Sequence, residues 1–113
     1  LVLNQDMPPN VNTDSIINNI PNKLTLNPSY PNPFNPNTKI SFDLPKSSKV
    51  KLQIVDIKGR GIANLLSNSL DSGTYNVNWN GTSDSGVNMS SGIYFIILNV
   101  DGSILTQKLS LIR

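Results

Sequence analysis

The sequence predicts an all-β protein in which two antiparallel sheets pack as a sandwich. Three observations support this prediction. From residue 24 onward, short apolar runs recur at a spacing of about ten residues, several of them alternate between apolar and polar side chains, and residues that favour turns separate them. About seven runs of this kind, with little or no helix, are typical of a sandwich.

The first part of the chain differs from the rest. Residues 1–23 contain three prolines and six asparagines without sustained periodicity, so we expect a linker or extended arm before a sandwich domain at 24–113. One helical turn at 13–20 is the most regular structure that we expect in this arm. The chain starts at Leu1 without a basic and apolar leader, which predicts a processed product or a fragment of a longer protein.

The first half of the domain should hold three strands. A short apolar run predicts a strand at 24–26, and alternation predicts strands at 39–44 and 49–56, with a turn at 45–48 between them. The side chains expected to point inward are Ile40, Phe42, Leu44, Val50, Leu52 and Ile54, and those expected to face solvent are Lys49, Lys51 and Gln53.

A tight turn and a short strand should come next. The turn at 57–60 contains Gly59, which can take a positive φ. We expect the strand at 61–66 and a loop at 67–73, because the loop segment is rich in Ser, Asn, Asp and Gly.

The last part of the domain should contain its central strand. The run at 74–80 places Tyr75, Val77 and Trp79 on one face, and a long polar loop is expected at 81–92. The run at 93–100 is apolar on both faces, as expected of a central strand, and we expect it to anchor the core together with Trp79. The sequence Asp-Gly at 101–102 predicts a hairpin that leads into the final strand at 103–113.

The stretch "YPNPFNPNT" at residues 30–38 should form a stiff strap outside the strand ladders. Its three prolines fix φ and donate no backbone hydrogen bond, and they are Pro31, Pro33 and Pro36. We expect Tyr30 and Phe34 to pin the strap across one end of the sandwich, and Asn32, Asn35 and Asn37 to close turns with nearby backbone. The alternative is a proline-rich ligand for a recognition domain.

The composition excludes several classes of function. The chain has no Cys, no His and no Glu, so disulfides, thiolate metal sites and the usual general base are absent, and no catalytic motif is evident among the aspartates and lysines. The net charge is +2 and the cations are spread along the chain, so no nucleic-acid partner is expected. No apolar stretch is long enough to insert into a membrane.

The polar loop offers a candidate calcium site. Asn80, Asp84 and Asn88 offer the hard oxygen ligands that Ca²⁺ prefers, although their spacing is not that of an EF-hand. The alternative is that these residues only shape turns around the loop glycines. No other cofactor is expected.

Four segments together resemble one known family. They are "YPNPFNPNTKISFDLP", "VKLQIVDIKGRGIANLL", "LDSGTYNVNWNGTSDSG" and "SSGIYFIILNVDG", followed by "KLSLIR" at the end. The chain resembles the C-terminal sorting domain, type A, of proteins exported by the type IX secretion system. It is also similar to the immunoglobulin-like domain of the flagellar hook-capping protein. The resemblance covers residues 24–113 and implies an immunoglobulin-like sandwich.

The resemblance also implies a function and its residues. A domain of this family is not an enzyme; it directs a secreted parent protein to an outer-membrane export machinery and hence to the cell surface or the outside of a Gram-negative bacterium. The family pattern of its terminal strand matches Lys108, Leu109, Leu111, Ile112 and Arg113. The family motifs place structural roles on Pro31, Pro33, Phe34, Pro36, Asp56, Gly59, Trp79, Gly81, Gly92 and Tyr94.

Two other functions remain open from the sequence. The chain could be a structural subunit of an extracellular filament or surface layer, assembled with copies of itself through the arm, whose apolar anchors would be Leu1, Val2, Leu3, Ile16, Ile17 and Ile20. It could also be a carbohydrate-binding module, but most of its few aromatic residues lie in strands as core residues should.

Overall fold

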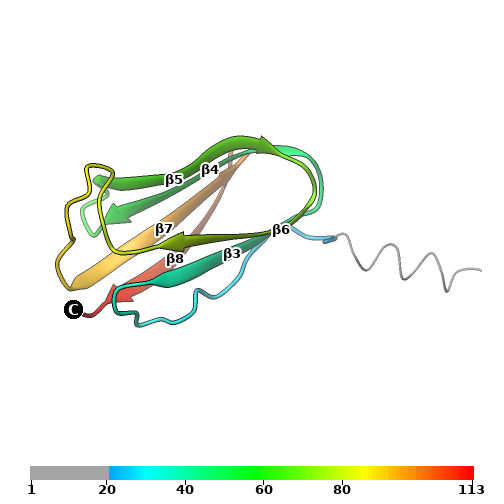
Figure 1. Ribbon diagram of the computed structural model, residues 1–113. Coiled ribbons are helices and arrows are strands. Elements are labelled where there is room, and N and C mark those ends of the chain that lie inside the picture. The colour runs from blue at the N-terminus through cyan, green and yellow to red at the C-terminus, as the bar shows by residue number, and fades with distance from the viewer. Residues whose placement is uncertain (1–20) are drawn as a thin grey trace, which may run out of the picture.

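The structure, a computed structural model, describes residues 21–113. In this part of the chain, seven strands form two antiparallel sheets (Figure 1). The strands are β2 (Thr25–Leu26), β3 (Thr38–Leu44), β4 (Ser48–Asp56), β5 (Gly61–Leu70), β6 (Gly73–Trp79), β7 (Gly92–Val100) and β8 (Ser103–Leu111). One sheet has the order β2-β3-β6 and the other β5-β4-β7-β8. The predicted antiparallel sandwich is confirmed.

The core lies between the two sheets and results from the alternation along their strands. The six inward side chains predicted for β3 and β4 are each no more than 3% exposed. β7 is an inner strand of its sheet, paired with β4 on one side and β8 on the other, as its apolar sequence predicts. Burial of these side chains is the main favourable contribution to folding.

Three aromatic rings fill one end of the core. The Trp79 side chain is 2% exposed, and its ring centroid lies 5.5 Å from that of Phe34 and 5.6 Å from that of Tyr94. The indole Nε1 donates a hydrogen bond of 2.8 Å to the carbonyl oxygen of Thr82, so its polar atom has a partner despite burial. Trp79 therefore lies in the core, where the sequence placed it.

Two turns have the positive φ angles expected from their residues. Asp101 and Gly102 both have positive φ, 50° and 92°, which suits the two-residue hairpin between β7 and β8. Gly59 has φ 82° in the turn after β4. Asp101 also accepts a hydrogen bond of 2.9 Å from the backbone N–H of Lys49, which connects the hairpin to β4.

The predicted loop at 67–73 was wrong, because β5 continues through Leu70. Ser67, Ser69 and Leu70 pair with Lys51, Lys49 and Ser48 of β4. Ser48 is accordingly the first residue of a strand and not part of a turn. The polar side chains of this half of β5 are exposed, so backbone pairing with β4, and not burial, makes it a strand.

No helix within residues 21–113 is long and apolar enough to cross a membrane. The helical turn predicted at 13–20 and the predicted apolar anchors of the arm fall outside the described residues.

Candidate functional site

The strap bonds to the outer edge of β8, the last strand of the four-stranded sheet. The backbone N–H of Phe34 donates to the carbonyl oxygen of Ser110, and the N–H of Ile112 donates to the carbonyl oxygen of Phe34, both at 2.9 Å. Phe34 and Leu111 thus form a parallel bridge. The prediction that the strap stays outside the strand ladders was wrong at this residue, because Phe34 is not a proline and keeps its N–H.

Asn32 supplies a second link to the same edge. Its side-chain Nδ2 donates to the carbonyl oxygen of Lys108 at 3.0 Å, and its Oδ1 accepts from the N–H of Ser110 at 3.1 Å. Pro31 and Pro33 flank it and have no N–H, so the side-chain amide stands in for a peptide group of a neighbouring strand. The expected bond to nearby backbone is therefore replaced by one to a strand more than 70 residues away.

The segment before the strap also contacts β8. The backbone N–H of Ser29 donates to Oε1 of Gln107 at 2.7 Å, and Nε2 of Gln107 donates to the carbonyl oxygen of Asn27 at 2.8 Å. From Gln107 to its end, the outer edge of β8 is therefore occupied by residues 27–34 of the same chain.

Only one of the two strap aromatics pins it. Phe34 is 1% exposed and packs against Trp79, whereas Tyr30 is 77% exposed. The expectation for Tyr30 was wrong: its backbone pairs with Lys39, and this pairing leaves the side chain in solvent. The hydroxyl of Thr38 donates to the carbonyl oxygen of Pro31 at 2.8 Å and closes the strap.

Arg113 joins the end of the chain to the polar loop at 81–91. Its backbone N–H donates to Oγ of Ser91 at 2.8 Å, its Nε donates to the carbonyl oxygen of Met89, and its Nη2 donates to the carbonyl oxygen of Gly81 at 2.7 Å. Hydrogen bonds from a guanidinium are stronger than neutral ones. Arg113 therefore holds the loop against the end of β8.

Gly81 is required where this contact forms. Its φ is +76°, and a Cβ at this position would lie 2.8 Å from Nη2 of Arg113 and 3.4 Å from the carbonyl oxygen of Pro36. The motif "WNG" therefore combines a core ring with a glycine that leaves room for the guanidinium. Tyr94, from the motif "SGIY", is buried and donates from its hydroxyl to the carbonyl oxygen of Ser90 at 2.7 Å.

The five residues of the predicted sorting signal fall into three environments. Leu109 and Leu111 are 0% and 2% exposed and belong to the core. Arg113 is bonded to the loop. Lys108 and Ile112 are exposed, Ile112 by 52%. Arg113 is exposed as well, but its guanidinium is bonded to Met89 and Gly81. Lys108 and Ile112 are therefore the exposed members of the set whose side chains do not hold the loop.

Asp56 organises the turn that carries the motif "DIKGR". Its Oδ1 accepts from the backbone N–H groups of Lys58 and Arg60, both at 2.9 Å, and its Oδ2 accepts from Nε of Arg60 at 2.8 Å. The bond from the Arg60 N–H, above all, holds the pKa of Asp56 below its ordinary value of 3.8, against the opposing effect of desolvation.

The three suggested calcium ligands already have protein partners or paired backbone. Asp84 accepts from the backbone N–H of Asn64 at 3.0 Å, Oδ1 of Asn80 accepts from the Thr82 hydroxyl at 2.6 Å, and Asn88 forms a bridge with Thr82. Residues 21–113 contain no group of three or more Asp side chains that could hold a metal ion. The calcium site stays a prediction from the sequence.

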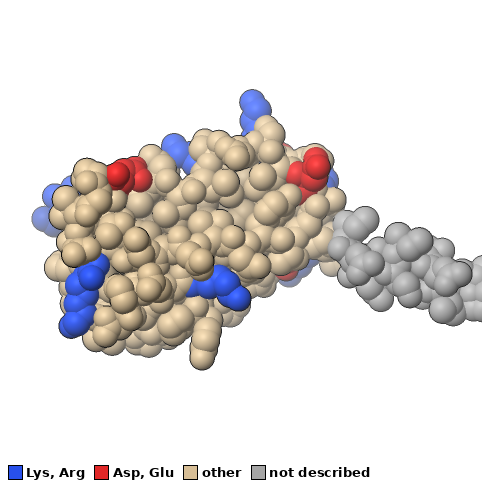
Figure 2. All heavy atoms as spheres, viewed as in Figure 1, with Lys and Arg blue, Asp and Glu red and all other residues tan. Residues whose placement is uncertain are grey.

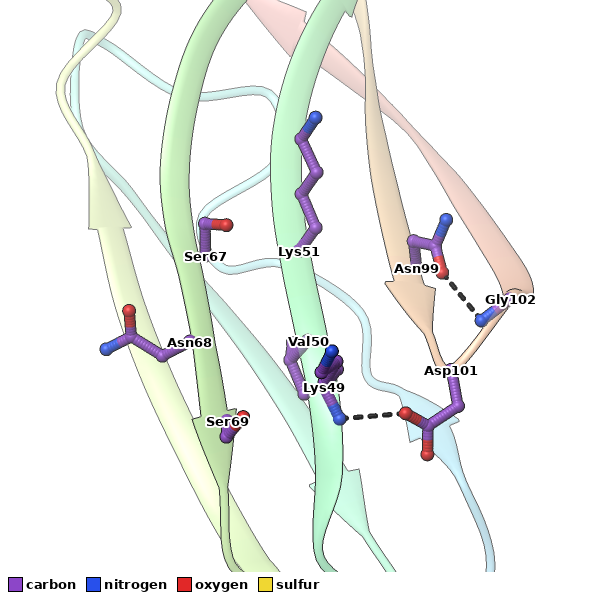
Figure 3. A pocket seen from close by; sticks show the side chains of 9 residues that line it. All are labelled: Lys49, Val50, Lys51, Ser67, Asn68, Ser69, Asn99, Asp101 and Gly102. Carbon is purple, nitrogen blue, oxygen red and sulfur yellow. Dashed lines mark hydrogen bonds between the residues drawn. The ribbon is translucent and has the colours of Figure 1, made fainter.

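The hollows on the surface include two that involve residues considered above. One, of about 300 Å³, is lined by the turn after β4 and by residues 89–94, and includes the exposed side chains of Ile57 and Ile93. The other, of about 450 Å³, is lined mainly by polar residues of β4, β5 and the hairpin at Asp101, and there Lys49 and Lys51 stand beside Ser67 and Ser69 (Figure 3). The two lysines face solvent, as predicted.

Sequence reasoning missed the residues that close the edge of β8. Asn32 and Gln107 act through partners at a sequence separation of 76 to 80 residues, which no local periodicity reveals. For Arg113 the resemblance supplied a position but no contact. From the residues themselves, only a final strand at 103–113 was predicted, and the structure has β8 there at Ser103–Leu111.

The comparisons with known proteins agree with this geometry. The family model of the secretion system C-terminal sorting domain matches residues 29–112. No curated protein matches the chain. Dimeric latent PorU from Porphyromonas gingivalis is similar over 79% of this chain and 9% of its own, with 20% identity and a TM-score of 0.60.

Two further solved structures share the fold. FlgD from P. aeruginosa is 26% identical over 66% of this chain and 61% of its own, with a TM-score of 0.52. The alkylpurine DNA glycosylase AlkC of Pseudomonas fluorescens, bound to DNA, is 17% identical over 80% of this chain and 30% of its own, with a TM-score of 0.51. The chain thus spans less than two thirds of each of these proteins. Because one of them is a DNA glycosylase, the fold alone does not decide what the chain does.

Proposed function

The chain belongs to the family of secretion system C-terminal sorting domains, and on this premise we propose that the outer-membrane export machinery contacts the exposed side chains at the end of β8. The family itself fixes the general function. The domain is not catalytic and directs the secretion of its cargo protein through the type IX system to the cell surface or the outside of a Gram-negative cell.

The observation that carries the proposal is the division of the terminal strand into buried and exposed members. Leu109 and Leu111 keep β8 in the core, and Arg113 holds the neighbouring loop, so these three stabilise the folded domain. Lys108 and Ile112 contribute little to the core, because both side chains are exposed. A machinery that binds the folded domain would therefore contact Lys108 and Ile112.

The surroundings of Ile112 extend this contact surface. Arg113, the next residue, is bonded to Met89 and Ser91, and both of these line the hollow with Ile57 and Ile93. A partner with an apolar surface that includes acidic groups would fit the exposed isoleucines and the cation of Lys108.

The experiment measures surface display of a reporter fused to residues 1–113 in a host with a type IX system. Ile112→Ser and Lys108→Ala should each lower display and leave the reporter in the periplasm. Ile104→Ser is the matched control, since Ile104 lies in β8, the strand that ends just before Ile112, and 54% of its side chain is exposed. Lys51→Ala is the control for the loss of a lysine. Both control fusions should be displayed as the unmodified one is.

A deletion of residues 108–113 distinguishes the family function from the contacts proposed for Lys108 and Ile112. It should abolish display whatever the machinery contacts, because it removes Leu109 and Leu111 from the core. Normal display of Ile112→Ser and Lys108→Ala together with loss after the deletion would refute the proposed contacts and leave the family function intact. The filament alternative depends on the arm, most of which lies outside the described residues, and stays a prediction from the sequence.

A further inference from the structure

β6 is an edge strand whose outer backbone groups have no partner among residues 21–113. It lies at the end of the sheet order β2-β3-β6, on the side of β3 that faces β5 in Figure 1. In β3, Lys39 and Ser41 direct their backbone groups toward Tyr30 and Asn27, so Ile40 and Phe42 direct theirs toward β6.

The same alternation fixes which residues of β6 face outward. Val77 and Tyr75, the partners of Ile40 and Phe42, use their N–H and C=O groups within the sheet. The backbone groups of Thr74, Asn76 and Asn78 therefore point away from β3. Three successive sites for an additional strand are left open.

This edge lacks the protection that edge strands normally carry. Natural sheets shield their edges with charges, prolines or a covering segment. The second half of β8, from Gln107 onward, is covered by the strap and the segment before it. The first part of β5 is covered by the loop, because the N–H of Asp84 donates to the carbonyl oxygen of Ile62 and the Asp84 carboxylate accepts from the N–H of Asn64. β6 contains no charged residue and no proline. Figure 2, viewed from the same side as Figure 1, shows few charged atoms on the surface around β6.

We propose that the β6 edge pairs with the β6 edge of a second copy of this chain, antiparallel about a twofold axis at Asn76. In this register Asn76 faces Asn76 of the second copy, Thr74 faces Asn78, and Tyr75 faces Val77. All three outward residues of each copy then exchange hydrogen bonds with the other copy. The two three-stranded sheets become one continuous sheet.

The side chains of β6 match in this register. Asparagine amides lie beside asparagine or threonine on the outer face, where each can donate and accept hydrogen bonds. On the inner face, Tyr75 and Val77 are only half-buried, and each would lie opposite the other, an aromatic and β-branched pair of the kind that stabilises sheets. No like charges meet, because the strand has none.

A second copy is favoured over another partner by this self-complementarity. An edge without charges offers no electrostatic selection for a different protein, whereas the sequence around Asn76 is suited to its own reverse. A twofold contact uses the same patch on both copies and closes after two. It differs in this respect from the filament considered above, and it does not involve the arm.

The test uses the complete chain of 113 residues and a cysteine at the proposed axis. Directly opposed hydrogen-bonded residues have Cα atoms about 5.5 Å apart, which is within the range of a disulfide. The chain contains no cysteine, so Asn76→Cys should give a single disulfide-linked dimer on mild oxidation. Thr106→Cys is the matched control and should give much less, because Thr106 is exposed on the first half of β8, which the strap does not cover.

Sedimentation equilibrium between about 10 µM and about 1 mM, the range of weak association, tests the unmodified contact. Asn76→Lys places two like charges at the axis, and Asn76→Pro removes an outward N–H without affecting the bonds to β3. Each should raise the dimer dissociation constant at least tenfold, while Thr106→Lys should leave it unchanged. Circular dichroism melting confirms that each variant is folded.

Three results would overturn the proposal. A chain that stays monomeric to about 1 mM has no such contact. A dimer that survives Asn76→Lys uses another surface. The third result is a chain that is monomeric and whose surface display in the reporter assay is abolished by Asn76→Lys but not by Thr106→Lys. In that case the β6 edge would pair with a strand of the export machinery. Loss of dimer with normal display supports the proposal independently of the contacts proposed for Ile112.

Discussion

Replacing Phe34 with alanine tests whether the strap is part of the core. The Phe34 side chain is 1% exposed and its ring centroid lies 5.5 Å from that of Trp79, so truncation should leave a cavity. Phe-to-Ala changes in cores cost about 3–5 kcal/mol. If the strap also leaves the edge of β8, the loss of its two backbone bonds adds about 1–3 kcal/mol.

Urea unfolding followed by the fluorescence of Trp79, the single tryptophan, measures this loss. A domain of this size is stable by about 5–15 kcal/mol, so Phe34→Ala should fold but unfold at a clearly lower urea concentration. Tyr30→Ala is the control, because Tyr30 is an aromatic residue of the same strap that is 77% exposed, and it should cost less than about 0.5 kcal/mol. A cost below about 1 kcal/mol for Phe34→Ala, or equal costs for both variants, would refute a strap held by Phe34.

Three further predictions concern the core, the loop and the turn. Trp79→Ala should cost about 3–5 kcal/mol in thermal unfolding followed by circular dichroism, and a cost under about 1 kcal/mol would contradict its burial. Gly81→Ala should cost about 1–2 kcal/mol of stability for its positive φ, and more because the new Cβ displaces the Arg113 guanidinium. In a double-mutant cycle, the cost of Gly81→Ala should be smaller when Arg113 is already replaced by alanine. Strictly additive costs would argue against a contact between the two residues. The lowered pKa of Asp56 means that its carboxylate stabilises the fold fully above its ordinary pKa of 3.8 and progressively less as the pH falls through its lower folded pKa. Asp56→Asn should therefore lower the melting temperature at pH 7, with a deficit that shrinks on acidification, and a deficit independent of pH would exclude the charge as its cause.

The sequence predicted the sandwich because most of its strands bury one face. The alternation in β3 and β4 and the continuous apolar run of β7 each depend on the local sequence alone, so their positions and core residues could be identified. The second half of β5 could not. Its serines and asparagine resemble a loop, and only pairing with β4, about 20 residues earlier, makes them a strand.

The candidate site was predictable in outline only. The resemblance indicated Lys108 to Arg113, but it could not distinguish side chains that build the core from those that remain accessible. Tyr30 and Phe34 looked equivalent, because proline-rich backbone has no period from which to tell the inner residue from the outer one. The bonds of Asn32 to β8 depend on a tertiary approach between distant segments, which composition and spacing do not encode.

The contacts between the strap and β8 also govern when the domain can finish folding. They join residues near 30 to residues near 110, with separations of 76 to 80 positions in the chain. The aromatic end of the core and the edge of the large sheet cannot close until the ribosome has released this last strand. A cargo protein whose synthesis stops early would carry an unclosed domain, with Phe34 lacking its backbone partners at Ser110 and Ile112. Recognition of the closed form would thus restrict export to chains whose translation has passed this strand.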